Sequence, residues 1–158
     1  MKLISRGPAD TEDIGLRLGM TLKPGDVVAL YGDLGSGKTT MTKGLAGAFG
    51  IGKRDITSAS YTIIAAYETE PPFYHIDLYR IEEGADLDNT GVWDCMGRDS
   101  VAVIEWAERL GSARPDNLIT VTIKDAGNNA REISIEGGRL TDMNKDMSDV
   151  PALDAVHK

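Results

Sequence analysis

Apolar residues along this chain fall into short runs, which polar turns rich in glycine and proline separate. Two runs, residues 27–31 (VVALY) and residues 100–106 (SVAVIEW), are apolar with little alternation, as expected for parallel strands buried on both faces. Residues 10–22 and 38–50 instead repeat apolar positions every three or four residues, which predicts helices. The first half of the chain therefore alternates strand and helix, which favours an α/β fold.

Each of the two predicted helices has one apolar face. For residues 10–22, Asp10 or Thr11 can cap the N-terminus. The apolar face of this first helix is formed by Ile14, Leu18 and Leu22. In residues 38–50 the apolar face is formed by Met41, Leu45 and Phe49, and three glycines are small enough for close packing on a sheet, Gly44, Gly47 and Gly50.

The remaining segments are mostly β-rich. Residues 1–5 alternate and predict a first strand, and residues 58–69 and 72–80 predict two strands with a hairpin-like connection at ETEPP. Residues 117–126 and 131–138 alternate around GNN, which is a strong hairpin signal. Short helices are predicted at residues 85–97 and 107–115. Residues 1–140 therefore form one domain with a mixed sheet, and the polar, acidic residues 141–158 are expected to be a disordered tail.

Composition narrows the functional classes. At 158 residues the chain fits one domain, and its net charge of −8 disfavours autonomous binding to DNA or RNA, because phosphate contacts require basic surface. No apolar stretch is long enough for a membrane span or a secretion signal. The single Cys95 offers neither a disulfide nor a metal site, so the expected location is the cytoplasm.

The segment GDLGSGKT, residues 32–39, matches the P-loop (Walker A) pattern between a predicted strand and a predicted helix. Its glycines let backbone N–H groups surround phosphate oxygens. Lys38 can reach the β- and γ-phosphates, and the Thr39 hydroxyl can bind Mg²⁺. The residues expected to contact the nucleotide here are Gly35, Ser36, Gly37, Lys38, Thr39 and Thr40.

A P-loop enzyme also needs a carboxylate at the end of a neighbouring strand. Glu105, at the end of VAVIE, is the first choice for the metal, and Asp77 in YHIDLYR is expected to share the metal or to orient the attacking water. The alternatives are an exposed strand-end charge for Glu105 and an ion pair with Arg80 for Asp77. His75 points the same way as Asp77 on a strand and either acts near the γ-phosphate or is structural. Trp106 is expected to be a core or interface anchor.

Four segments together resemble the bacterial TsaE (YjeE) family: GDLGSGKTT, SASYT, YHIDLYR and VIEWAERL. They occur in the family's order and spacing, and the resemblance covers residues 5 to 137. It implies a P-loop NTPase three-layer sandwich with a mixed, mainly parallel sheet and a C-terminal β-hairpin. At residues 58–61 the family's usual S-P-T-F reads SASY, so that Ser60 retains a hydroxyl where the family has threonine.

The resemblance also implies a function. Members are similar to a small ATPase that binds ATP and Mg²⁺ and supports the TsaB–TsaD pair in forming N6-threonylcarbamoyladenosine at position 37 of tRNAs that read ANN codons. The tRNA is then contacted only through the partners. Carried over by motif, Lys38, Asp77 and Glu105 are catalytic, Thr39 and Glu105 bind the metal, and Thr11 lies near the nucleotide.

Two other functions remain open on the residues alone. A small-molecule kinase would need an acceptor pocket and an arginine-bearing lid, and no such lid is evident between the P-loop and VIEW. A nucleotide-dependent docking switch with negligible turnover is harder to separate from the ATPase. Adenine rather than guanine is supported by the resemblance and by the lack of an NKxD motif.

Overall fold

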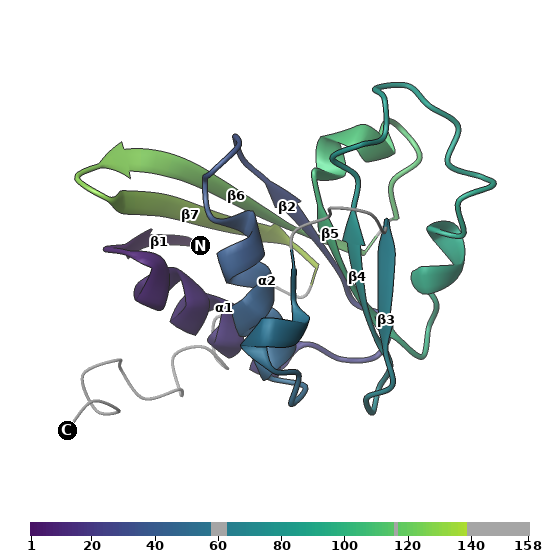
Figure 1. Cartoon of the computed structure of the whole chain (residues 1–158), viewed down its shortest axis with the longest axis horizontal. Coiled ribbons are helices and arrows are strands. Elements are labelled where there is room, and N and C mark those ends of the chain that lie inside the picture. Colours follow the sequence, from purple (N-terminus) through teal and green to yellow (C-terminus); the bar gives the residue numbers. More distant parts are fainter. Residues whose placement is uncertain (58–62, 116, 139–158) are drawn as a thin grey trace.

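The computed structural model describes residues 1–57, 63–115 and 117–138 and shows one seven-stranded sheet with two α-helices on one face (Figure 1). The strand order is β1-β7-β6-β2-β5-β4-β3. In chain order the elements are β1 (Lys2–Ser5), α1 (Pro8–Thr21), β2 (Val27–Tyr31), α2 (Lys38–Gly47), β3 (Ile64–Tyr67), β4 (Phe73–Asp77), β5 (Val101–Glu105), β6 (Leu118–Gly127) and β7 (Ala130–Gly137).

The centre of the sheet is parallel and its edges are antiparallel. Strand β2 pairs in parallel with β5 on one side and β6 on the other, and β4 continues the parallel set beside β5. Strands β3, β7 and β1 add antiparallel neighbours. The expected α/β fold with a mixed sheet is confirmed, as is the C-terminal hairpin, whose turn places Asn128 and Asn129 at positive φ.

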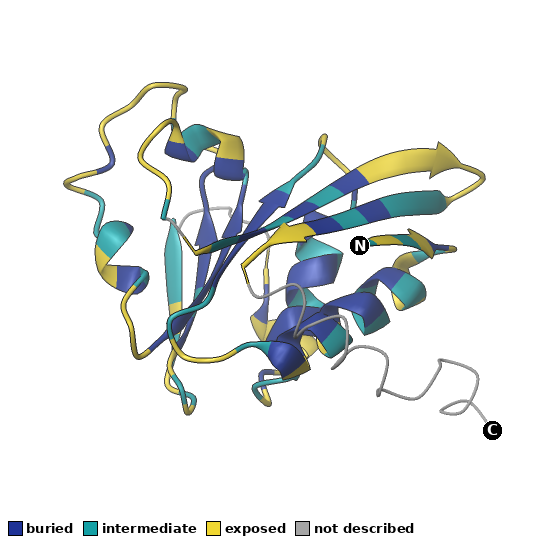
Figure 2. Cartoon of the chain, turned by 180° about the vertical axis from the view of Figure 1, so that it is seen from behind, coloured by how far each residue is buried: buried dark blue, intermediate teal, exposed yellow. Residues whose placement is uncertain are grey.

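The central strands are buried on both faces (Figure 2). On one face, α1 and α2 cover an apolar cluster that includes Val28, Leu30 and Val103. On the other face, the chain between β4 and β5 and the segment after β5 cover a second cluster that includes Ala29 and Ile104. Among the described residues, the layer on this second face contains 3-10 helices rather than α-helices.

The helix expected at residues 85–97 is absent apart from one 3-10 turn, Trp93–Cys95, so that prediction is wrong. Gly91 at φ 81° breaks the helical path. Buried Leu87 and Val92 nevertheless pack on the sheet, which explains their apolar spacing. The short helix expected at residues 107–115 is a 3-10 helix, Ala107–Leu110, which ends at Gly111.

Helix α1 begins earlier than the sequence pattern predicts. Its cap is Gly7 and its first residue is Pro8, whose fixed φ suits that position. Asp10 and Thr11 therefore lie within the first turn, and the predicted cap is wrong. The Asp10 carboxylate accepts the Arg6 backbone N–H at 2.9 Å. The Thr11 hydroxyl lies 2.6 Å from that of Ser5, so it ties the helix to β1.

The glycines of α2 allow close contact with α1 rather than with the sheet. A Cβ atom at Gly44 would lie 2.0 Å from the Glu12 carbonyl oxygen, and one at Gly15 would lie 2.4 Å from the Met41 carbonyl oxygen. Gly47 is exposed and Gly50 lies in the turn after the helix. The expectation of close packing is therefore correct for Gly44, but its partner is the neighbouring helix.

Some predictions fall outside the described residues. These are the first part of the strand expected at residues 58–69, the family segment at residues 58–61 and the tail from residue 141. Within the described ranges, no helix combines the length and the apolar character that crossing a membrane requires.

Candidate functional site

The P-loop connects the central strand to its helix, as the motif requires. Strand β2 ends at Tyr31, and residues 32–37 lead into α2. At Gly32 a Cβ atom would lie 2.5 Å from Ser36 Oγ and 2.7 Å from the Ile123 carbonyl oxygen, so no larger residue fits. Gly37 caps α2 at φ 112°, a conformation that favours glycine. The loop therefore has a backbone conformation that few residues other than glycine can adopt at positions 32 and 37.

Lys38 lies over the loop and is 5% exposed. Its Nζ donates to the carbonyl oxygens of Gly32 at 2.5 Å and Asp33 at 2.9 Å. The same ammonium lies 4.0 Å from the ring centroid of Trp106, a cation–π contact. Burial lowers the pKa of Lys38, while nearby carboxylates, Glu105 first among them, oppose that shift. The cation is thus held at the mouth of the loop between carbonyl oxygens and an aromatic face.

The two predicted carboxylates meet at the carboxyl ends of adjacent parallel strands. Asp77 ends β4, Glu105 ends β5, and the two are register partners. Glu105 is 2% exposed. Its Oε2 accepts the Thr39 hydroxyl at 3.1 Å and its Oε1 accepts the Thr42 hydroxyl at 2.9 Å. Glu105 is therefore bonded directly to the helix that follows the P-loop.

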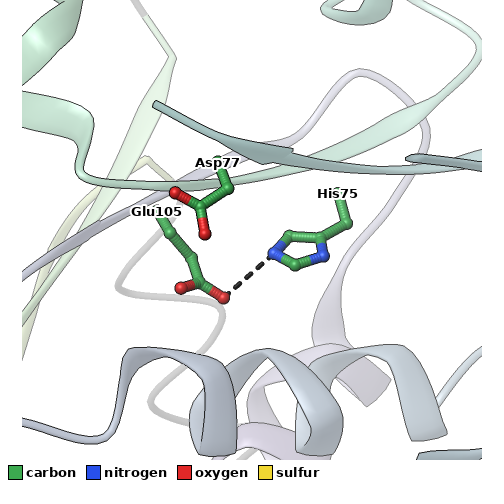
Figure 3. Close-up of side chains that lie close together, drawn as sticks. All are labelled: His75, Asp77 and Glu105. Atoms are coloured by element: carbon green, nitrogen blue, oxygen red, sulfur yellow. Dashed lines mark hydrogen bonds and ion pairs between the residues drawn. The ribbon is translucent and has the colours of Figure 1, made fainter. Parts of the chain in front are cut away.

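His75 bonds to Glu105. Its Nε2 lies 2.9 Å from Glu105 Oε1, and because an ionised carboxylate only accepts, the histidine N–H is the donor. Ligand atoms of His75, Asp77 and Glu105 lie within 4.8 Å of one another, and Figure 3 shows the three side chains converging. The expectation that His75 and Asp77 share one face of the strand is confirmed. Asp77 Oδ1 accepts the Tyr79 backbone N–H at 2.9 Å.

A cavity of about 360 Å³ lies between the P-loop and these carboxylates. Its rim is apolar: Leu34 is 77% exposed, Tyr79 is 47% exposed, and the Tyr79 ring lies 5.1 Å from that of Trp106. Trp106 adopts φ 56°, which turns the chain sharply after Glu105. The sequence reading of Trp106 as a core or interface anchor missed this position at the cavity, since the turn is set by backbone geometry.

The donor set at this cavity suits a hard divalent cation. Thr39 offers a hydroxyl oxygen, and Glu105 and Asp77 offer carboxylate oxygens, the ligand types that Mg²⁺ prefers. Thr39 and Glu105 are already in contact, so few side-chain movements would be needed to bind one ion. The residues present therefore fit the metal that the sequence predicts.

Each of the residues expected to contact the nucleotide lies at one of two cavities. Gly35, Gly37 and Thr40 border both the large cavity and a smaller one of about 100 Å³ on the other side of the loop. Ser36 and Thr11 border only the smaller one, and the Thr11 hydroxyl is already hydrogen-bonded to Ser5.

Arg80 follows the end of β4 and is exposed.

Two residues near the loop were missed by sequence reasoning. Thr42 bonds to Glu105, and its spacing of three from Thr39 on a helix is the signal that could have revealed it. Arg131 donates from Nε to the Ser36 carbonyl oxygen at 3.1 Å, across 95 positions of sequence. No local pattern could have found that contact.

A central parallel strand that leads through a P-loop into a helix, beside two strand-end carboxylates, defines a P-loop α/β protein. The model of the family described as "Threonylcarbamoyl adenosine biosynthesis protein TsaE" matches residues 5–133. The chain belongs to the TsaE family.

Individual relatives agree with this assignment. Two proteins named "tRNA threonylcarbamoyladenosine biosynthesis protein TsaE" are similar to the chain. That of Treponema pallidum is 37% identical and the match covers 85% of this chain and 99% of the relative. That of Bacillus subtilis is 38% identical and the match covers 80% and 79%. A crystal structure of Bacillus subtilis YdiB matches with a TM-score of 0.73 at 34% identity, over 94% of this chain and 93% of that one.

Proposed function

We propose that this protein is a P-loop ATPase that binds ATP with Mg²⁺ and hydrolyses it to support a TsaB–TsaD pair. That pair would form N6-threonylcarbamoyladenosine at position 37 of tRNAs that read ANN codons. The observation that carries the proposal is the 3.1 Å contact between Thr39 and Glu105, which joins the P-loop helix to the end of β5. Family membership supports the pathway.

Each site residue has a role that follows from its chemistry. The backbone N–H groups of residues 35–37 would bind phosphate oxygens, and Lys38 would neutralise the β- and γ-phosphates. Thr39 and Glu105 would hold Mg²⁺, which would stabilise the charge that develops on the phosphates. Asp77, beside Glu105, would orient the attacking water and accept its proton.

The charge balance supports action through partners. A net charge of −8 gives little basic surface for tRNA, so the tRNA would be held by the partner enzymes. Slow hydrolysis by the isolated chain is expected, because Lys38 is the one cation of the large cavity's lining among the described residues. A partner that completes the site would raise the rate.

Reconstitution tests the proposal. Formation of the modified tRNA by TsaB, TsaD and the enzyme that makes the threonylcarbamoyl-adenylate would be measured with wild-type chain, with Lys38→Ala, and without the chain. We expect the modification to need the wild-type chain and to be lost with Lys38→Ala, and the ATPase rate of the chain to rise when TsaB–TsaD is added. Modification that proceeds equally with Lys38→Ala would overturn the ATPase proposal.

The same assays separate the two alternatives. A docking switch would bind ATP and the partners but show no turnover above background even in the complex. A small-molecule kinase would consume ATP only with an added acceptor and would be indifferent to TsaB–TsaD.

A further inference from the structure

The turn that follows β4 begins beside the carboxylate proposed to orient the attacking water. Residues 78–81 form this turn, in which the Ile81 backbone N–H donates to the Leu78 carbonyl oxygen at 3.0 Å. Asp77, which ends β4, is 5% exposed and lines the large cavity. Its Oδ1 accepts the Tyr79 backbone N–H at 2.9 Å, so the carboxylate is bonded to the backbone of the turn. A shift of the turn would therefore move this carboxylate.

The start of the turn is attached to the sheet. The Leu78 backbone N–H donates to the Glu105 carbonyl oxygen at 3.1 Å, so the backbone bonding of β4 to β5 extends one residue beyond β4. The Leu78 side chain is fully buried in the apolar cluster on this face of the sheet. The sheet and its core therefore fix this first end of the turn.

The other end of the turn is held by Arg109. This residue lies in the 3-10 helix Ala107–Leu110, which follows β5. Its Nη1 donates to the Ile81 carbonyl oxygen at 2.6 Å, across 28 positions of sequence, and the bond is partly buried. A hydrogen bond from a charged donor is shorter and stronger than one between neutral groups. One side chain therefore holds the end of the turn that lies beyond the sheet.

The segment that carries Arg109 also contacts the P-loop lysine. Trp106 comes directly before the 3-10 helix, and its carbonyl oxygen accepts the Arg109 backbone N–H at 3.0 Å. The Trp106 ring lies 4.0 Å from the Lys38 ammonium and 5.1 Å from the Tyr79 ring. The segment after β5 therefore contacts the turn at two points, the Tyr79 ring and the Ile81 carbonyl oxygen.

We propose that Arg109 is a positioning residue for ATP hydrolysis. By holding the turn at Ile81, it keeps the Asp77 carboxylate directed at the attacking water. Arg109 does not itself line the large cavity, so it acts through Asp77 and not on the nucleotide. The inference rests on the proposed function, because it gives Arg109 a part in a hydrolysis that is itself proposed.

The test compares Arg109→Met, Arg109→Lys and Arg114→Met with the wild type. Methionine keeps an aliphatic side chain without a donor, whereas lysine keeps a charged donor. Arg114→Met is the matched control, because Arg114 donates from Nε to the Gly111 carbonyl oxygen at 3.0 Å, within its own segment. The measurements are kcat for ATP hydrolysis in the TsaB–TsaD complex, the Kd for ATP, and hydrogen exchange of the backbone amides of residues 77–81.

We expect Arg109→Met to lower kcat about tenfold and to leave the Kd for ATP unchanged, because a small displacement of a catalytic group slows the chemical step while the groups proposed to bind phosphate stay in place. Hydrogen exchange at residues 77–81 should become faster, because the turn opens more often. Arg109→Lys should restore part of both properties, and Arg114→Met should match the wild type.

A double variant separates positioning from general support of the fold. If Arg109 acts through Asp77, Arg109→Met should lower kcat little further in an Asp77→Asn background, because residues that act as a unit are not additive. Should Arg109→Met fail to fold, Arg109→Lys carries the same comparison through its smaller loss of kcat.

Four results would each overturn the role of Arg109 alone. They are an unchanged kcat, unchanged exchange at residues 77–81, an equal loss of ATP affinity, and additive losses in the double variant, each observed while the wild-type complex hydrolyses ATP. Absence of ATP hydrolysis by the wild-type complex would instead overturn the proposed function, and this role with it.

Discussion

His75 and Glu105 form a buried hydrogen bond, 2.9 Å from Nε2 to Oε1, beneath the P-loop. The same oxygen accepts the Thr42 hydroxyl, while the other carboxylate oxygen faces Thr39. Glu105 is therefore held on one side by a strand neighbour and on the other by the helix. His75 fixes the orientation of the carboxylate without reaching the cavity lining itself.

The first prediction concerns this orienting role. His75→Ala should raise the Mg²⁺ concentration needed for half-maximal ATP hydrolysis about tenfold, as loss of a partner that orients a metal ligand commonly does. His75→Gln retains an N–H donor and should restore part of the affinity. Magnesium titrations of the ATPase rate in the TsaB–TsaD complex would measure both. Identical magnesium dependence in wild type and His75→Ala would rule out the role.

The two carboxylates should differ in their effects. Glu105→Gln removes the charge next to Thr39 and should lower both the ATPase rate and magnesium affinity by at least about tenfold. Asp77→Asn should lower the ATPase rate while leaving magnesium affinity closer to that of the wild type, because Asp77 is proposed to orient the attacking water rather than to bind the metal. Parallel steady-state and magnesium-binding measurements would compare them. A wild-type ATPase rate in Glu105→Gln would indicate that Asp77, and not Glu105, binds the metal.

Nucleotide affinity should depend on the close approach at Gly32. In Gly32→Ala the new Cβ would collide with Ser36 Oγ and with the Ile123 carbonyl oxygen, so the loop must shift. We expect ATP affinity to fall at least about tenfold, since the N–H groups proposed to bind phosphate would move with the loop. Gly35→Ala is the control: no atom of the described residues lies within 4 Å of its Cβ position, although its φ of 76° adds strain. Calorimetry with ATP would show whether Gly32→Ala is the worse of the two.

Stability should depend on the contact between α1 and α2. Gly44→Ala would place a Cβ 2.0 Å from the Glu12 carbonyl oxygen and should lower the free energy of unfolding by about 1–3 kcal/mol, the usual cost of overpacking. In Gly47→Ala, on the same helix, the new Cβ would contact a single atom of the part of the chain that the structure describes, Leu16 Cδ1 at 3.7 Å. It should leave stability unchanged or raise it by less than about 1 kcal/mol through helix propensity. Urea denaturation would compare them, and equal stabilities would contradict the close contact.

Features that depend on near neighbours in the chain can be predicted from the amino-acid sequence alone. The P-loop can be identified in the sequence because its backbone conformation needs glycines at fixed positions. The buried strands can be identified because apolar runs without alternation indicate burial on both faces. Glu105 and Asp77 follow from the same logic, as carboxylates that end such strands. The predicted assignment of these residues to ATP and Mg²⁺ stays a prediction.

Which of these residues contact one another depends on how the strands and helices pack in three dimensions. Strand order and register place Asp77 beside Glu105 and give His75 its partner. The packing of α1 on α2 explains why position 44 is a glycine, and the β6–β7 hairpin brings Arg131 into contact with Ser36. Such contacts join positions tens of residues apart, and they follow from the burial of the whole sheet and both helices rather than from any local pattern.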